Sequence, residues 1–165
     1  MLLKYKNWIY IISFSCLYNV LYLFSNNIPN PAVPNGFIAI SMVIPVVAGY
    51  LLGPYSGAMT GGIGVGLNVL INGSPITVAA MVPIMIMGFA AGYVGKNRNI
   101  LLTSLTIIIG HSLNILYFIR LGLISSLSEK ISVIALSLLS EAAFDIVIII
   151  TIITSLKKFF RKERW

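Results

Sequence analysis

Long apolar segments separated by short polar breaks run through the whole chain. No Asp, Glu, Lys or Arg occurs from Asn7 to Gly95. A bilayer crossing needs about 20 mostly apolar residues, and Gly, Pro and Asn clusters mark breaks between elements. The pattern therefore predicts six membrane-spanning helices in a single membrane domain of residues 1–165, at about 8–24, 37–52, 56–71, 76–94, 100–123 and 131–156.

The composition changes this picture only by excluding other classes of protein. Hydrophobic residues make up 58% of the chain and charged residues 9%, whereas soluble domains carry about 25% charged residues. A soluble globular protein, a disordered chain and a nucleic-acid-binding module are therefore excluded. We predict an all-α integral membrane protein, a six-helix bundle that crosses the cell membrane several times.

The net charge of +7 indicates an orientation in the membrane. Five of the eleven basic residues lie in the last nine positions, as is typical of the cytoplasmic flank of a membrane helix. With six spans, nine basic residues fall on the side of the termini, and only Arg120 and Lys130 fall on the other side. Both termini are therefore predicted to be cytoplasmic, and the loops 25–36, 72–75 and 125–130 to face outward.

Small residues recur at a spacing of four around the break between the second and third spans, at Gly49, Gly53, Gly57 and Gly61. In lipid, small residues at this spacing let helices approach closely. The sequence Gly-aromatic-x-x-Gly also occurs twice, at 49–53 and 88–92, after Pro45 and Pro83. Two interpretations follow, which are packing between helices of this chain and a docking surface for a partner.

Polar side chains inside the predicted spans give the candidate site. A carboxylate facing lipid costs about 2.5–3.5 kcal/mol or more, so such groups should face the interior or a wet cavity. The polar sets of the third, fifth and sixth spans all lie in the predicted outer half. We expect a small polar ligand to bind there through Asn68, Asn72, His111, Asn114, Tyr117, Arg120 and Glu141.

Each member of this set also has a simpler interpretation. Glu141 could pair with His111 in a contact that only stabilises the fold. Arg120 could extend its side chain to the outer membrane interface without binding a ligand. Asn68 and Asn72 could only bond across helices. Asp145, four residues after Glu141, is interpreted as structural or as a partner contact.

Motifs for catalysis or metal binding are not found in the sequence. There is one His and one Cys, Cys16, and no H-x-x-x-H or H-E-x-x-H spacing, so a metal site is poorly supported. An ATP-binding motif is also missing. We therefore predict no enzyme activity, no catalytic residue, no metal and no cofactor, and any energy for transport has to come from another protein.

The segment from Ile44 to Gly61, IPVVAGYLLGPYSGAMTG, resembles the AG-x-L-x-GP-x-x-G-A-x-x-G segment of S components. These proteins are the substrate-capture subunits of energy-coupling factor (ECF) vitamin importers. The resemblance implies a vitamin-sized ligand bound near the outer face, under the loop between the first two spans. It also implies docking on a transmembrane coupling protein that carries two cytoplasmic ATPases. We find no signature for thiamine, riboflavin or biotin.

Docking residues follow from the same resemblance. Many S components carry Ala-x-x-x-Ala in the first helix for docking, and here Ser15 and Asn19 stand at that spacing. The predicted docking residues are therefore Ser15 together with Gly57 and Gly61. Two other functions remain open, a ligand-free membrane scaffold of the rod-shape type and a small intramembrane enzyme that uses His111 and Glu141.

The predicted orientation can be tested by cysteine labelling. In a Cys16→Ser background, a membrane-impermeant thiol reagent added outside intact cells should label Asn30→Cys and leave Asn97→Cys unlabelled. The reverse pattern would invert the topology and move the candidate site to the cytoplasmic face.

Overall fold

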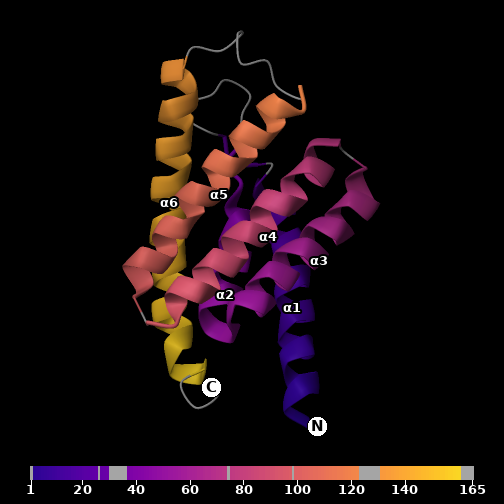
Figure 1. Ribbon diagram of the computed structural model, residues 1–165, viewed down its shortest axis with the longest axis vertical. Coiled ribbons are helices and arrows are strands. Elements are labelled where there is room, and N and C mark those ends of the chain that lie inside the picture. Colours follow the sequence, from indigo (N-terminus) through magenta and orange to yellow (C-terminus); the bar gives the residue numbers. More distant parts are fainter. Residues whose placement is uncertain are drawn as a thin grey trace.

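The computed structural model describes residues 2–25, 27–29, 37–73, 75–97, 99–122 and 131–160, and this part of the chain is helical (Figure 1). The predicted all-α class agrees with it. A single isolated bridge between Pro29 and Phe37 is the β-type pairing within these ranges. The elements are α1 (Leu2–Ser25), η1 (Ile40–Met42), α2 (Val43–Leu52), α3 (Pro54–Asn72), α4 (Pro75–Gly95), α5 (Ile100–Arg120) and α6 (Ile131–Phe160).

The helices follow the predicted segments, with two differences. α1 and α6 extend beyond the apolar segments, to Leu2 and Phe160. The predicted second span is a 3-10 turn followed by a helix of only 10 residues, α2. Four helical segments are long and apolar enough to cross a membrane, 6–25, 77–95, 100–120 and 136–156. Six crossings therefore stay a prediction, as does the side on which the termini lie.

The turn between α2 and α3 is formed by Gly53, which has a freer backbone than other residues, and Pro54, which has a more restricted one. Gly53 has a φ of 100°, a backbone conformation that side chains rarely allow. Pro54 follows as the first residue of α3. A backbone N–H at this position makes no hydrogen bond within the helix, so a proline, which has no N–H, is tolerated there. The predicted Gly-Pro break is therefore present, and it turns the chain within a single residue.

The predicted outward loops are only partly described. Residues 26 and 30–36 of the first loop and all of 125–130 lie outside the described residues, as does Asn30 of the labelling experiment. The start of α1 and the end of α6 lie at the same end of the bundle in Figure 1. This agrees with termini on one side and leaves open which side that is.

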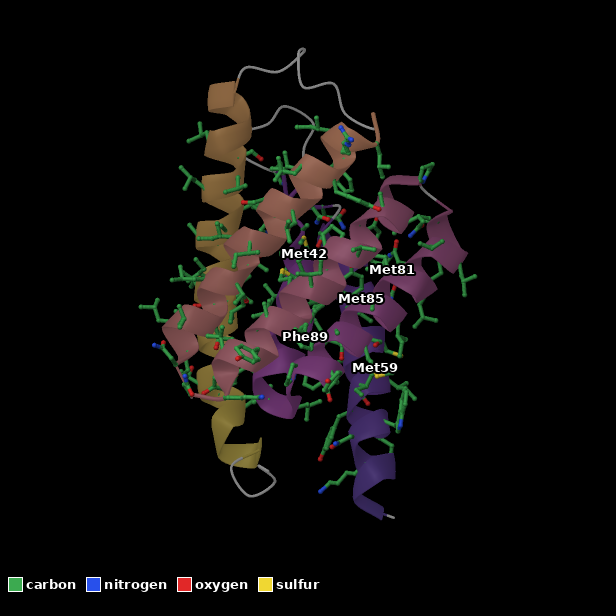
Figure 2. The ribbon with its side chains drawn as sticks, in the orientation of Figure 1. Met42, Met59, Met81, Met85 and Phe89 are labelled. Atoms are coloured by element: carbon green, nitrogen blue, oxygen red, sulfur yellow. The ribbon has the colours of Figure 1, made fainter. Side chains whose placement is uncertain are left out.

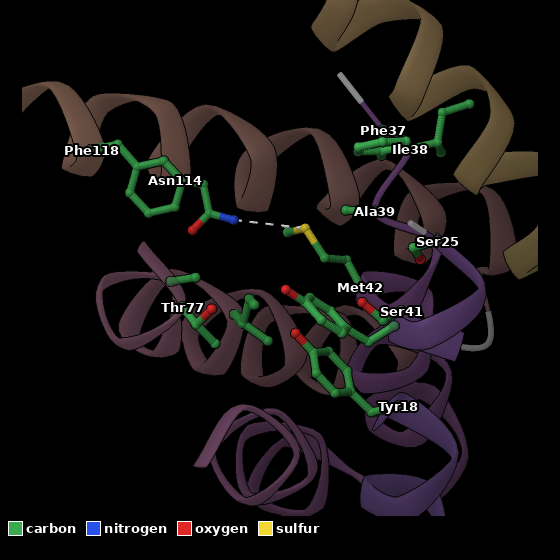
Figure 3. Close-up of a pocket in the computed structure, with 13 residues that line it drawn as sticks. Tyr18, Ser25, Phe37, Ile38, Ala39, Ser41, Met42, Thr77, Asn114 and Phe118 are labelled. Atoms are coloured by element: carbon green, nitrogen blue, oxygen red, sulfur yellow. Dashed lines mark hydrogen bonds between the residues drawn. The ribbon is translucent and has the colours of Figure 1, made fainter. Parts of the chain in front are cut away.

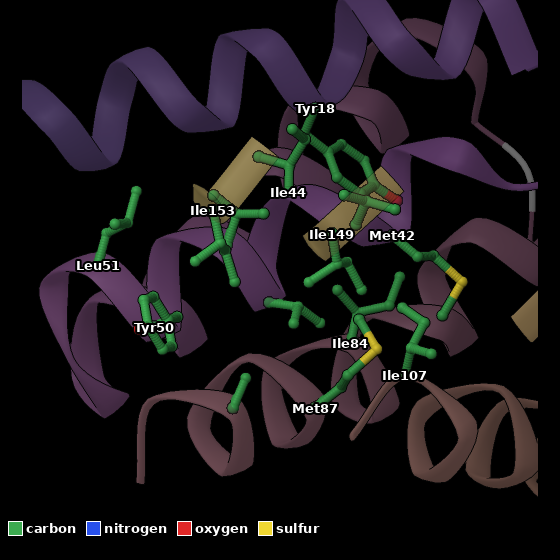
Figure 4. Packing of buried hydrophobic residues seen from close by; sticks show 14 of the residues in the cluster. Tyr18, Met42, Ile44, Tyr50, Leu51, Ile84, Met87, Ile107, Ile149 and Ile153 are labelled. Carbon is green, nitrogen blue, oxygen red and sulfur yellow. The ribbon is translucent and has the colours of Figure 1, made fainter. Parts of the chain in front are cut away.

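α2 lies at the centre of the bundle. Nine of its ten residues are buried, and it contacts α1, α3, α4, α5 and α6. The apolar core forms around it from side chains of α4, α5 and α6, and Figure 4 shows Ile84, Met87, Ile107, Ile149 and Ile153 packed beside it. Its apolar sequence therefore forms a protein core and presents little surface to lipid.

Glycine backbones touch directly where α2, α3 and α4 meet. A Cβ on Gly88 would lie 2.6 Å from the carbonyl carbon of Gly57, and one on Gly49 would lie 2.9 Å from the backbone nitrogen of Gly92. The two Gly-aromatic-x-x-Gly sequences thus pack against each other. Farther along α3, Met81 and Met85 of α4 fill the space beside its glycines (Figure 2). These contacts support the packing interpretation.

The glycine contact predicts a contrast between two alanine substitutions. Gly88→Ala should lower the free energy of unfolding by about 1–3 kcal/mol, because backbone rather than a flexible side chain blocks the new methyl group. Gly66→Ala is the matched control, since its Cβ would meet only Met81 Cε at 3.8 Å, and it should change stability by less than about 1 kcal/mol. Thermal unfolding in detergent measures both, and equal stabilities would contradict the close contact.

Candidate functional site

A cavity of about 210 Å³ lies between α1, the 37–42 segment, α4 and α5 (Figure 3). The C-terminal part of α1, the N-terminal part of α4 and the C-terminal part of α5 meet there. The cavity is therefore in the half of the bundle away from the start of α1 and the end of α6. It is lined by Tyr18, Tyr22, Ser25, Phe37, Ile38, Ala39, Ser41, Met42, Thr77, Ala80, Ile84, Asn114 and Phe118.

The walls are mostly apolar and aromatic, with a few polar groups among them. Four aromatic rings contribute, from Tyr18, Tyr22, Phe37 and Phe118. Hydroxyl groups come from Ser25, Ser41 and Thr77, and the only side-chain amide of the lining comes from Asn114. An apolar cavity with a small number of placed polar groups is the usual form of a site for a small organic molecule.

Asn114 is poorly satisfied within the described residues. It is 8% exposed, its Nδ2 donates to Met42 Sδ at 3.7 Å, and its Oδ1 has no hydrogen-bond partner among the described residues. A thioether sulfur is a weak acceptor, and a buried unpaired amide oxygen costs free energy. The Asn114 amide therefore has an oxygen without a partner and a nitrogen that is only weakly bonded.

Of the seven predicted ligand residues, only Asn114 lines this cavity. Tyr117 and Arg120 are exposed on the outside of α5. Helical geometry explains the difference, because each residue turns the helix by about 100°, so nine residues make about two and a half turns and end on the opposite side of the helix. His111 and Arg120 therefore point in nearly opposite directions. Ligand binding by Tyr117 and Arg120 stays a prediction.

Asn68 and Asn72 form a pair of their own on α3. Asn68 is 2% exposed and Asn72 is exposed. Asn72 Nδ2 donates to Asn68 Oδ1 at 3.2 Å, and neither residue lines the cavity. The two side chains are therefore bonded to each other within α3, whereas the simpler interpretation expected bonds across helices. Their role in ligand binding stays a prediction.

His111 lies between two carboxylates of α6. His111 Nε2 is 2.9 Å from Asp145 Oδ2, and His111 Nδ1 is 3.8 Å from Glu141 Oε2. Glu141 Oε1 also accepts a hydrogen bond from the Ala39 backbone N–H at 2.7 Å. Asp145 is fully buried, so its pairing with His111 offsets the free-energy cost of removing the carboxyl group from water. Within the described ranges, no group of three or more His, Cys, Asp and Glu suited to a metal ion is present.

The aromatic and hydroxyl residues of the cavity were missed by sequence reasoning. Tyr18, Tyr22 and Ser25 follow one another at about one helical turn on α1, which is a signal the sequence did offer. Ser41 and Met42 come from the 3-10 turn, which the apolar pattern merges with the second span. Residues at an irregular turn cannot be assigned a face from a helical period.

The three predicted docking residues lie inside the chain. Ser15 is fully buried, and its Oγ donates to Thr60 O at 3.2 Å. Gly57 packs against the backbone of Gly88, and a Cβ on Gly61 would meet Ile84 Cγ2 at 2.9 Å. These residues serve packing between α1, α3 and α4, and docking of a partner on them stays a prediction.

Comparison with known proteins identifies a family that matches almost the whole chain. A family model described as "ECF-type riboflavin transporter, S component" matches residues 4–162. No curated protein and no solved structure matches significantly. The matched range includes every helix that contributes to the cavity.

The buried pair of His111 and Asp145 predicts strong coupling between the two residues. His111→Leu or Asp145→Leu alone should destabilise the protein by about 3 kcal/mol or more, because each leaves a buried polar partner uncompensated. The double variant should cost less than the sum of the two single variants. Unfolding of the purified protein in detergent measures the three values, and additive effects would contradict a direct pair.

Proposed function

Since the chain belongs to the family of S components of ECF-type riboflavin transporters, we propose that it captures riboflavin in the cavity between α1, the 37–42 segment, α4 and α5. The chain is a substrate-binding subunit of an ECF importer and belongs to a transporter family rather than an enzyme family. The single observation that carries the proposal is the family match across residues 4–162.

The chemistry of the cavity supports a flavin as the ligand. Riboflavin has a flat, three-ring system with carbonyl and N–H groups along one edge, and a chain of hydroxyl groups. Aromatic side chains such as Tyr18, Tyr22 and Phe118 offer faces and edges for stacking on such rings. The Asn114 amide offers one donor and one acceptor, which matches a ring edge that carries both.

The size of the cavity indicates that binding involves movement. Sites for drug-sized ligands have volumes of about 300–1,000 Å³, and this cavity has about 210 Å³. We propose that side chains of the lining move apart when riboflavin enters, while the backbone of the 37–42 segment keeps its hydrogen bonds to Ile28 and Glu141.

Import would then be completed by partners. We propose that the subunit lies in the cell membrane with the cavity facing outward and docks on a transmembrane coupling protein with two cytoplasmic ATPases. The chain itself carries no ATP-binding motif, so ATP hydrolysis would have to be supplied by those ATPases.

The alternative function is a ligand-free membrane scaffold, and the buried polar pairs are the observation that favours it. His111 with Asp145 and Asn68 with Asn72 are polar residues paired to each other, as a scaffold would require. A scaffold gives no reason, however, for a cavity lined by four aromatic rings and the Asn114 amide. That cavity, together with the family match, favours ligand binding.

The proposal is tested by titrating the purified protein in detergent with riboflavin and following flavin fluorescence, with thiamine and biotin as competitors. We expect saturable quenching that neither competitor reverses. Mass spectrometry of ligand that co-purifies in mild detergent should identify the same flavin. A protein that leaves riboflavin fluorescence unchanged and co-purifies with another vitamin would overturn the proposed substrate.

The amide of Asn114 predicts a specific loss of affinity. Asn114→Ala should weaken riboflavin binding by about 5- to 150-fold, which corresponds to about 1–3 kcal/mol for a lost hydrogen bond in a buried site. Asn19→Ala is the matched control, since it removes a partly buried amide that does not line the cavity, and its affinity should stay near that of the parent. Equal losses in the two variants would argue for a general effect on folding.

A further inference from the structure

The carboxylate of Glu141 reaches from α6 to the wall of the cavity. Its Oε1 accepts the Ala39 backbone N–H at 2.7 Å, across 102 positions of sequence. The Glu141 side chain is 15% exposed, so water competes little for this bond. Hydrogen bonds to a charged group in such surroundings are roughly twice as strong as neutral ones.

Ala39 occupies the middle of the wall that faces the ligand. It lines the cavity itself, and so do Phe37, Ile38, Ser41 and Met42 around it. The Ile38 N–H donates to Ile28 O at 3.0 Å, and the Ala39 N–H donates to Glu141. Two successive peptide groups are thus held from opposite sides, one by the chain after α1 and one by α6.

The other carboxylate oxygen of Glu141 lies near the buried pair. This oxygen, Oε2, lies 3.8 Å from His111 Nδ1, and His111 Nε2 lies 2.9 Å from Asp145 Oδ2. Asp145 stands one helical turn after Glu141 on α6, so the two carboxylates flank the same imidazole. The chain of contacts runs from Asp145 through His111 and Glu141 to the Ala39 peptide group.

The geometry points to Glu141 as a positioning residue of the ligand site, which holds the 37–42 wall through the Ala39 N–H and does not touch the ligand. The inference rests on the proposed function for the identity of the ligand. It differs from a direct ligand contact, because Glu141 does not line the cavity and its Oε1 is already bonded to Ala39.

The experiment combines two measurements on the full chain in detergent. Exchange of the Ala39 amide hydrogen, followed by NMR of the ¹⁵N-alanine-labelled protein without ligand, reports the contact itself. Riboflavin titration by fluorescence reports its effect on binding. The variants are Glu141→Ala, Glu141→Asp and Glu141→Gln. The control is Thr151→Ala, which removes an exposed hydroxyl of α6 that bonds within its own helix at 2.8 Å.

We expect Glu141→Ala to exchange the Ala39 amide at least about tenfold faster and to bind riboflavin at least about tenfold more weakly. Glu141→Asp keeps the charge but is one methylene shorter, so it should share both losses, and it replaces the alanine variant if that variant does not fold. Glu141→Gln keeps an oxygen that can accept from Ala39 but loses the charge, so it should lie between the parent and Glu141→Ala in both measurements. Thr151→Ala should match the parent.

Three outcomes would overturn the inference. Unchanged Ala39 exchange in Glu141→Ala or Glu141→Asp would show that the contact does not hold the wall. Faster exchange with unchanged affinity would show that the wall position does not matter for the ligand. Weak binding by Glu141→Gln with normal Ala39 exchange would indicate a direct ligand contact. A parent chain that does not bind riboflavin would refute the proposed function instead, and the exchange measurement would still decide whether Glu141 holds the wall.

Discussion

Direct contact between glycine backbones of α2, α3 and α4 is the constraint on which the rest of the structure depends. Gly49 and Gly57 both lie against Gly88, with no side chain between the helices. This approach lets a helix of 10 residues sit at the centre of the bundle and bury almost all of its surface. In lipid, where apolar side chains gain little by leaving the solvent, such close packing is a main source of association.

The position of α2 in turn sets the position of the cavity. The 3-10 turn and residues 37–39 lead directly into α2, so fixing α2 between α3 and α4 also fixes where the wall begins. α1 closes the other side, with Asn19 Nδ2 donating to Gly64 O at 3.0 Å and the Tyr18 ring packed on Gly64. Tyr18 therefore serves both the core and the cavity (Figures 3 and 4). Packing and ligand chemistry share residues here.

The helices were largely predictable from the sequence, and the site was not. Apolar segments bounded by Gly, Pro and Asn place the helices within a few residues, because each break has a local cause such as Gly53 and Pro54. The site depends on which way each helix is turned, which a single sequence fixes poorly. His111 pairs with Asp145 and does not line the cavity, so its predicted contact with a ligand stays a prediction, whereas Asn114, one turn later, does line the cavity.

The short length of α2 has a consequence for the order in which the molecule can assemble. Ten residues rise about 15 Å, half of the hydrocarbon thickness of about 30 Å, so α2 alone is shorter than a bilayer crossing and depends on neighbouring helices for its packing. The residues that enclose it come later in the chain, Gly88 on α4 and Ile149 and Ile153 on α6. The helix at the centre of the bundle is therefore synthesised early, but its packing is completed only after α6 has been synthesised.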